Sequence, residues 1–283
     1  MSKTPSSTLG IVIRKALLVV LFCAGLGFVL LPIFYAFSLS FRTNAEVLKV
    51  PPHLFPPHFS VVGWLNMTDI TSVFRYIGNT AIVAATTIAF TVSLAGLAAY
   101  TFARLRFRWT NLLMVFLLVS QMFPGAAVIV PLFRTVTKIG LYNSHFGLAL
   151  VYTGFTIPFC TWMLYGYFKT IPKELEEASS IDGCSRLHAL WSIILPLALP
   201  GIAATAVFVM LAAWNEYTFA SLFIQDNEKW LITPGLTSFI GQYWSAVNSM
   251  AAAAISASVP PVVAFILVRR YFISGLVAGA VKG

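Results

Sequence analysis

The sequence predicts an all-α integral membrane protein with six transmembrane helices and a helix–glycine–helix loop on the cytoplasmic face. Three observations predict this fold. Only 10% of the 283 residues are charged, whereas an ordinary soluble domain is about a quarter charged. Six stretches of about 20 residues are almost free of charge, as membrane-spanning helices are. Four of the nine acidic residues crowd into one short segment between two of these stretches, so that segment has a distinct structure.

The six predicted spans are 16–37, 80–102, 112–133, 147–167, 199–223 and 250–268. At about 1.5 Å per residue they cover roughly 30–37 Å, enough to cross the hydrocarbon core. Only the fifth span carries a charged residue, Glu216. The third contains Pro124, Gly125 and Pro131, which break or kink a helix unless neighbours satisfy the freed backbone groups. Six spans leave little chain for anything else, so we expect residues 1–283 to form a single transmembrane domain.

The basic residues are divided unevenly between the two sides of the membrane that these spans define. The N-terminal segment, the second loop, the fourth loop and the tail 269–283 hold three each, 12 of the 18 Lys and Arg residues. Basic residues accumulate in cytoplasmic loops. The bias therefore places both termini and the loop 171–198 in the cytoplasm, which agrees with an even number of spans.

Several other kinds of protein are not indicated. The net charge of +9 follows from the loop asymmetry, so it does not predict nucleic-acid binding. The first apolar run has about 22 residues and no clear cleavage site, whereas a secretory signal has a core of roughly 7–15, so we expect a retained helix. Cys23, Cys160 and Cys184 lack the spacing of a disulfide framework or a metal site.

The acidic segment predicts a short helix over 174–182. Carboxylates in its first turn complement the positive end of the helix dipole. Pro172 lies just before the start, where a missing backbone donor costs nothing. Gly183 then ends the helix, because glycine adopts a positive φ most easily.

A second helix is predicted from about Ser185, with an apolar stripe and an end at Pro196, just before the fifth span. The two helices would form an elbow on the cytoplasmic face. Two interpretations remain open on these residues alone. The elbow is an ordinary amphipathic loop at the membrane surface, or it presents carboxylates to a partner.

The residues themselves carry a resemblance. The run Glu177-Ala178-Ser179-x-x-Asp182-Gly183, followed after nine residues by Ile193-x-Leu195-Pro196, resembles the cytoplasmic EAA loop of bacterial ABC-importer permeases. The departure is Ser179, which stands where the motif has its second alanine and is also small. The resemblance implies that this loop seats in a cleft of an ATPase subunit, that Glu177 meets a basic residue there, and that Gly183 forms the bend.

Further segments narrow the resemblance to carbohydrate-importer permeases of the maltose type, and most of all to their smaller subunit. These segments are the prolines of the first external loop, the P-x6-PLF run at 124–133, the run Trp214-Asn215-Glu216 and the ending GLVAGAVKG. In that subunit type the C-terminal tail enters the ATPase dimer. The resemblance therefore implies ATPase contacts for the last four residues, Ala280, Val281, Lys282 and Gly283.

The resemblance also implies the partners and the location. They are a second homologous permease, an ABC ATPase dimer and an extracytoplasmic sugar-binding protein, in the inner membrane of a bacterium or archaeon. The chain lacks the phosphate-binding run G-x-x-x-x-G-K-[ST], so we expect a transport subunit that is not itself an enzyme and has no cofactor. ATP and Mg would be bound by the ATPase. The expected substrate is a disaccharide, an oligosaccharide or a related polyol.

Candidate residues of a translocation path are Glu216 with its neighbours Asn215 and Tyr217, and more weakly Gln121 and Asn79. A lone carboxylate inside a span is costly, which makes it a candidate for function. The alternative is a structural or gating contact between helices. The Trp-Asn-Glu run resembles one shared by permeases for different sugars, which argues against Glu216 choosing the substrate.

The main rival to an ATP-driven importer is an ion-coupled secondary carrier. Such a carrier usually has several ionisable groups within its spans, or paired broken helices in two repeated halves. This chain has one intramembrane glutamate and no visible repeat. An intramembrane enzyme is disfavoured too, since no catalytic serine motif and no H-E-x-x-H run occurs.

Overall fold

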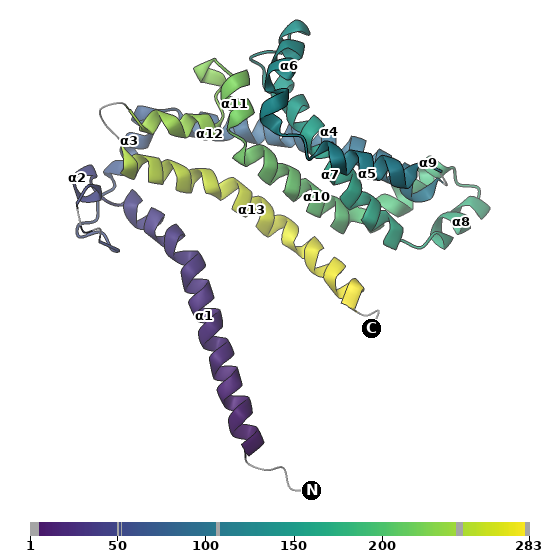
Figure 1. The fold of residues 1–283 in the computed structure, drawn as a ribbon, viewed down its shortest axis with the longest axis horizontal. Coiled ribbons are helices and arrows are strands. Elements are labelled where there is room, and N and C mark those ends of the chain that lie inside the picture. The colour runs from purple at the N-terminus through teal and green to yellow at the C-terminus, as the bar shows by residue number, and fades with distance from the viewer. Residues whose placement is uncertain (1–5, 50, 52, 106–107, 242–245, 281–283) are drawn as a thin grey trace. The chain divides into compact units, whose positions relative to one another are not determined.

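The computed structural model describes residues 6–49, 51, 53–105, 108–241 and 246–280. Within these residues the regular elements are all helices, which confirms the expected all-α class (Figure 1). The chain divides into two compact units, one formed by 1–71 with 238–256 and the other by 72–237 with 257–283. The predicted coupling loop lies in the second unit.

The first unit contains α1 (Ser6–Ser40), α2 (Asn44–Val47), α3 (Val62–Ile70) and the first turns of α13 (Val247–Ala280). Buried Arg42 follows α1 and donates to Ser38 Oγ (2.8 Å) and to the carbonyl of His53. Asn248, at the start of α13, donates to the carbonyl of Arg42 (2.9 Å). These bonds join the end of α1 to the start of α13, 206 residues apart for the last pair.

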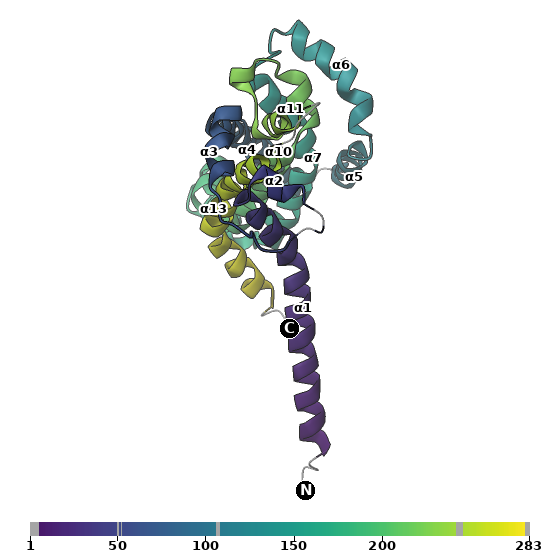
Figure 2. The same ribbon diagram turned by 90° about the vertical axis from the view of Figure 1, so that its left-hand side faces the viewer.

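Three long helices form the centre of the second unit, α4 (Val73–Arg104), α7 (His145–Thr170) and α10 (Leu195–Asn215). They lie side by side in both views of the ribbon (Figures 1 and 2). Small side chains allow the close approach, as expected for helices that pack in a membrane. Ala95 and Ala99 of α4 are fully buried, and the hydroxyls of Thr91 and Thr156 lie 2.8 Å apart between α4 and α7.

Shorter helices complete this unit. They are α5 (Thr110–Ser120), α6 (Gly125–Lys138), α8 (Glu174–Ile181), α9 (Arg186–Ala189), α11 (Thr218–Phe223) and α12 (Ile232–Gly235), with a π-helical turn at Leu190–Ile194 and 3-10 turns at Asn227–Lys229 and Leu236–Phe239. The buried cluster around Leu164, Phe168 and Ile194 joins α7 to the π-helical turn and to α10. This cluster fixes the base from which α8 and α9 project.

Five helices in the described residues are long and apolar enough to cross a membrane, and the number is six if one bent pair of helices counts as a single span. The five are Ile13–Ser40, Val73–Arg104, His145–Thr170, Arg186–Asn215 and Val247–Tyr271. The pair is α5 with α6, whose axes meet at 93°. Four of these helices overlap the predicted spans one, two, four and six and extend beyond them.

The predicted third span, 112–133, is not one continuous helix. The chain leaves α5 after Ser120, and Pro124 adopts an extended conformation (φ −63°, ψ 124°) as the residue that precedes α6. A proline disfavours the helical conformation of the residue before it, so the helix ends ahead of Pro124. Pro131 lies inside α6 without ending it.

The predicted fifth span, 199–223, also requires correction. The helix ends at Asn215, Glu216 is extended (φ −75°, ψ 125°), and the chain resumes as the separate helix α11. At the other end the helix is longer than expected. It runs from Arg186 to Asn215 through Pro196, which was predicted to stop it.

The π-helical turn explains why Pro196 is tolerated. Leu195 N–H donates to the carbonyl of Leu190, five residues back, in place of the usual four. A π turn shifts the hydrogen-bond pattern just before the proline, which has no N–H to contribute. The helix therefore passes from the loop into the membrane without a break.

Candidate functional site

The two short helices α8 and α9 form the predicted elbow. Gly183 has a φ of +83°, which side-chain-bearing residues rarely adopt. Gly183 N–H donates to the carbonyl of Ser180 (3.2 Å), and Cys184 N–H donates to that of Ser179 (2.9 Å). This pair of bonds is the Schellman arrangement that closes a helix end. The expected helix with a glycine end is confirmed within one residue of its predicted boundary.

The second arm of the elbow begins as predicted at Ser185. Its side-chain oxygen accepts from His188 N–H (3.3 Å) and so caps α9. From there α9, the π-helical turn and α10 form one helix of 30 residues, Arg186–Asn215. At about 1.5 Å per residue this helix is roughly 45 Å long. The second arm of the elbow and α10 are therefore one continuous helix.

An ion pair ties the elbow to the end of α4. Glu176, in the first turn of α8, pairs with the Nε of Arg104, and their side chains are only 18% and 6% exposed. The other carboxylate oxygen of Glu176 accepts from Tyr100 Oη (3.1 Å). Arg104 also donates to the carbonyl of Ile171 (3.1 Å), just before α8. Four polar groups thus hold α8 in one position.

The other face of the elbow is exposed. Glu177, Ala178 and Asp182 are open to solvent, and Ile181 beside them is 87% exposed. Ser179 is buried, and its hydroxyl donates to the carbonyl of Glu176 (2.8 Å), so this position has a packing role within α8. The elbow therefore has one anchored face and one free face that combines an acidic with an apolar group.

The other loop residues of the motif lie further along the continuous helix that contains α10. Leu195 is half-buried and Pro196 is exposed at the start of α10. Ala280 is the last residue of α13. The remaining tail residues predicted to contact an ATPase, Val281, Lys282 and Gly283, lie outside the described residues.

Glu216 does not lie within a continuous helix, whereas the predicted fifth span implied that it would. It follows the last residue of α10, and its two oxygens accept from Phe219 N–H (3.0 Å), Ala220 N–H (3.0 Å) and Tyr152 Oη (2.8 Å). The carboxylate therefore caps the start of α11, where backbone N–H groups have no helical partner, and joins it to α7. Thr233 Oγ1 donates to its main-chain carbonyl (2.6 Å).

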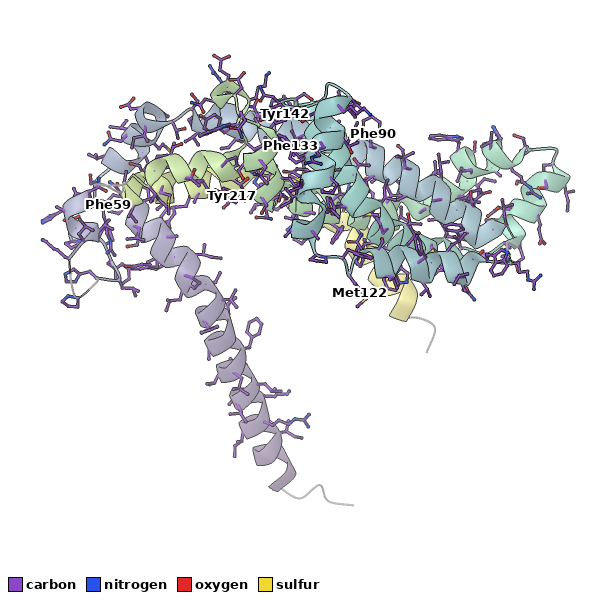
Figure 3. All side chains as sticks on the ribbon, turned by 45° about the horizontal axis from the view of Figure 1, so that its top comes forward. Phe59, Phe90, Met122, Phe133, Tyr142 and Tyr217 are labelled. Atoms are coloured by element: carbon purple, nitrogen blue, oxygen red, sulfur yellow. The ribbon has the colours of Figure 1, made fainter. Side chains whose placement is uncertain are left out.

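The other predicted path residues differ in the hydrogen bonds and the exposure of their side chains. Gln121, at the α5–α6 bend, donates to the carbonyl of Phe155 in α7 (2.8 Å), and Asn215 donates to the carbonyl of Leu211 in its own helix (2.8 Å). Tyr217, marked in Figure 3, is 49% exposed beside Glu216. The structure thus gathers Asn215, Glu216 and Tyr217 at one helix break, where the Tyr217 ring is half exposed.

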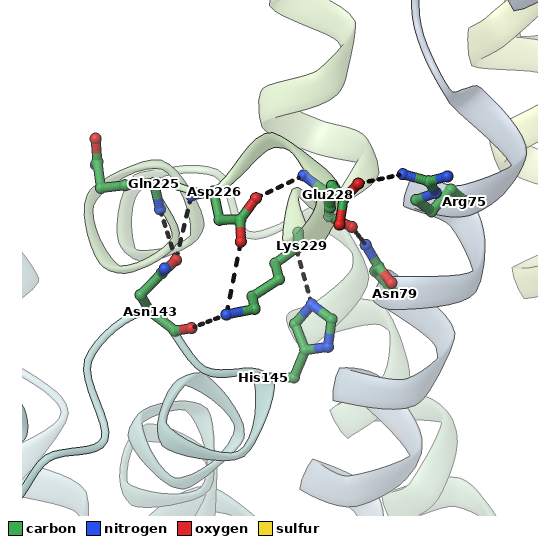
Figure 4. A network of polar contacts seen from close by, with 8 residues as sticks. All are labelled: Arg75, Asn79, Asn143, His145, Gln225, Asp226, Glu228 and Lys229. Carbon is green, nitrogen blue, oxygen red and sulfur yellow. Dashed lines mark hydrogen bonds and ion pairs between the residues drawn. The ribbon is translucent and has the colours of Figure 1, made fainter.

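Asn79 belongs to a different group, near the start of α4. Its amide donates to the carbonyls of Glu228 and Trp230 (both 2.9 Å). Figure 4 shows the contact with Glu228 within a network that also includes Asn143 and Lys229. Asn79 and Arg104 are 25 residues apart on α4, or roughly 38 Å. Asn79 therefore belongs to the opposite end of α4 from the elbow.

Sequence reasoning missed Glu176, Arg104 and Tyr100 as residues of the site. The charge rule placed the second and fourth loops on the same side, so Arg104 and the acidic cluster were expected on one face. Which of the four acids would pair with it depends on how α8 packs against α4. No local signal in the sequence carries that information.

Known proteins resemble the chain over much of its length. Residues 91–276 match the family described as "Binding-protein-dependent transport system inner membrane component". The trehalose/maltose transport system permease protein MalG of Thermococcus litoralis is 39% identical over 222 residues, 77% of this chain and 79% of that protein. The maltodextrin transport system permease protein MdxG of Bacillus subtilis is 31% identical over 257 residues, 90% of this chain and 91% of that protein.

A solved structure has a similar fold. It is a chain from a bacterial ABC transporter involved in the import of the acidic polysaccharide alginate, with a TM-score of 0.78 at 20% identity. The match covers 96% of this chain and 99% of the other. The likeness in fold thus extends over nearly the whole chain.

Proposed function

The chain belongs to the family of binding-protein-dependent transport system inner membrane components, and we propose that it is one of two permease subunits of an ATP-binding-cassette importer for a sugar. One observation supports a role for this chain in coupling transport to the ATPase. The α8–α9 elbow is fixed on its inner face by Arg104 and Glu176 and is exposed on its outer face at Glu177 and Ile181. A docking element needs both a firm attachment and a free surface.

The free surface fits an ATPase subunit that offers a basic group and an apolar cleft. Glu177 would pair with the basic group, and Ile181 would enter the cleft. Covering Ile181 would stabilise the complex, because burial of apolar surface is worth about 25 cal/mol per Å². The C-terminal residues Ala280 to Gly283 are proposed as a second contact with the ATPase dimer.

The continuous helix Arg186–Asn215 supplies the mechanical link. When the ATPase dimer closes on ATP, the elbow moves with it, and α10 transmits the movement to the break at Glu216. Such coupling requires that the elbow bind one arrangement of the ATPase better than the other. ATP and Mg would be held by the ATPase subunits, and this chain would bind neither.

The remaining partners follow from the same proposal. A second permease would complete the path, and an extracytoplasmic binding protein would deliver the sugar. The elbow and both termini would face the cytoplasm of a bacterial or archaeal cell, as the distribution of basic residues favours. Substrates named for the relatives, trehalose/maltose and maltodextrin, support a di- or oligosaccharide.

Within the path, Tyr217 is the best placed of the candidate residues to meet a sugar. Its ring is half exposed, whereas the Glu216 carboxylate and the side-chain NH2 group of Gln121 are already bonded to protein. An aromatic face with a hydroxyl suits a ligand that has both apolar C–H faces and polar edges.

The test is a complex co-expressed with the permease, ATPase and binding-protein partners and purified through a tag on this chain. Glu177→Lys should lose the ATPase, or keep it while losing sugar-stimulated ATP hydrolysis. Glu228→Lys is the matched control, since it is the same charge reversal on an exposed residue at the far end of α4. If Glu177→Lys behaves as wild type, the elbow is not the coupling site.

A second outcome would count against the whole proposal. If no ATPase associates with the wild-type chain, and the chain transports sugar in liposomes without one, ion-coupled transport replaces ATP-driven import. A gradient of protons or sodium would then be the driving force to vary.

A further inference from the structure

Two cavities follow each other along α4, and we call them together the groove. The cavity nearer the elbow has a volume of about 500 Å³ and is lined by polar groups that include Thr101, Lys173 and Arg186. The next cavity, of about 520 Å³, is almost entirely apolar. Its lining includes Leu97 of α4 and Leu199 of α10.

Successive residues of the same two helices, α4 and Arg186–Asn215, line both cavities. On α4, Ser93 and Leu97 line the apolar cavity while Tyr100 and Arg104 line the polar one. These positions follow at intervals of four, three and four, so they share one face of the helix. On the opposite wall, Ala189 lines the polar cavity and the residues that follow it line the apolar one.

The length and position of the groove match one leaflet of a bilayer. It runs along α4 from Val92 to Leu105, 14 residues, or roughly 20 Å. Half of a bilayer of about 40–45 Å with its headgroups is of that thickness. Trp191 lines the apolar cavity, two residues after Ala189 of the polar one, and is 68% exposed, as tryptophan at a membrane interface often is.

The charge at the polar end is not balanced within the chain. Arg104 is neutralised by Glu176, but Lys173 and Arg186 form no ion pair among the described residues. Both are exposed, and the one further acid in the lining is the exposed Glu177. A basic pocket between transmembrane helices on the cytoplasmic side is suited to an anionic lipid headgroup.

From this combination we infer that the groove binds an anionic phospholipid of the cytoplasmic leaflet, with its acyl chain between α4 and α10 and its phosphate on Lys173 and Arg186. The inference rests on the cytoplasmic placement of the elbow in the proposed function. A phosphate between Lys173, which precedes α8, and Arg186, which begins α9, joins the two arms of the elbow. The lipid would therefore stiffen the coupling element.

The experiment is native mass spectrometry of the purified complex in detergent with equal amounts of phosphatidylglycerol and phosphatidylcholine. The wild-type complex should retain about ten times as much phosphatidylglycerol as phosphatidylcholine. The double change Lys173→Gln with Arg186→Gln should reduce that excess to about onefold, because the headgroup loses both cations. Arg134→Gln with Lys138→Gln, which removes two exposed cations from α6, should leave the excess unchanged.

A second variant fills the apolar half. Gly96 lines the groove, and a Cβ added there would meet no atom within 4 Å, so Gly96→Leu should fold, fill the apolar cavity and expel the acyl chain. The control is Gly78→Leu, on the same helix, outside the groove, with equally open space. Gly96→Leu should lose retained lipid of both kinds, and Gly78→Leu should not.

Two results would overturn the inference. Equal retention of the two lipids by wild type would mean that Lys173 and Arg186 do not select a headgroup. Release of the second permease by Gly96→Leu, with lipid retention unchanged, would show that a neighbouring subunit's helix occupies the groove. Retention of the ATPase is recorded in the same spectra, so failure of the proposed function appears separately as its loss from wild type.

Discussion

Arg104, the last residue of α4, forms an ion pair with Glu176 in the first turn of α8, and both side chains are almost withdrawn from solvent. The pair joins the end of a membrane-spanning helix to the loop that we propose as the coupling element. Because Tyr100 also bonds the Glu176 carboxylate, the acid has little freedom to leave. The elbow and α4 should therefore move as one body.

The first prediction concerns this pair. Glu176→Gln should leave the Arg104 charge buried without its partner, which typically costs about 3 kcal/mol. Amide exchange in α8 should then accelerate by roughly 100-fold, because local opening becomes easier by that amount. Hydrogen–deuterium exchange of the peptide that covers Glu174–Ile181 measures it. Glu228→Gln, which breaks an exposed pair, is the control and should change nothing; equal exchange in the two variants would contradict the anchoring role.

The second prediction concerns the bend. Gly183→Ala should cost about 1–2 kcal/mol, since the φ of +83° is unfavourable for a residue with Cβ. No atom lies within 4 Å of a Cβ at this position, so the cost arises from the backbone alone. Gly183→Asn should cost less, because asparagine tolerates a positive φ. Sugar-stimulated ATP hydrolysis by the reconstituted complex should fall in the order glycine, asparagine, alanine.

Gly166→Ala is the control for that series. It lies within α7, has no positive φ and is equally open, so the substitution should be neutral or slightly stabilising. If alanine at 183 is as active as glycine, the bend does not need its present backbone conformation during transport.

The third prediction concerns the helix break beyond α10. Glu216→Gln should weaken the two bonds to Phe219 N–H and Ala220 N–H, by about 1–2 kcal/mol, because a neutral acceptor replaces a charged one. Tyr152→Phe removes only one bond and should have the smaller effect. We expect both variants to slow uptake of every transported sugar by similar factors. A change in the ratio of kcat/KM between two sugars would instead show that Glu216 contacts the substrate.

The fourth prediction concerns the network in Figure 4. Asn143 has a φ of +55°, and its side-chain oxygen accepts from Gln225 N–H (3.1 Å) and Asp226 N–H (3.2 Å). Asn143→Gly keeps the backbone conformation but removes that acceptor, at a cost of about 1–2 kcal/mol. Trypsin should then cut after Lys229 several times faster than in wild type. The same substitution at exposed Asn66 should not alter the rate at Lys229, and an unchanged rate in Asn143→Gly would mean that the loop is held by its other contacts.

The sequence by itself determined the features that depend on local chemistry. Apolar runs near 20 residues predicted the spans, because backbone groups in lipid must be satisfied within a helix. The elbow could be predicted because its signals are local. The end of α8 depends on Gly183 and the start of α9 on Ser185, and each residue makes its bonds within one turn of the chain. The acidic face of α8 was visible, but its division into an anchored Glu176 and a free Glu177 was not.

Tertiary structure decided that division and the true form of two spans. Arg104 and Glu176 are 72 residues apart, so their pairing depends on how α4 and α8 pack. Glu216 ends a helix because Tyr152 of α7 and the start of α11 hold its carboxylate, and neither contact could be inferred from a run of apolar residues. Pro196 failed to end a helix because a π-helical turn precedes it, stabilised by the buried Leu190 and Ile194. Local pattern thus set which segments are helical, and long-range packing set where they end and which charges remain free.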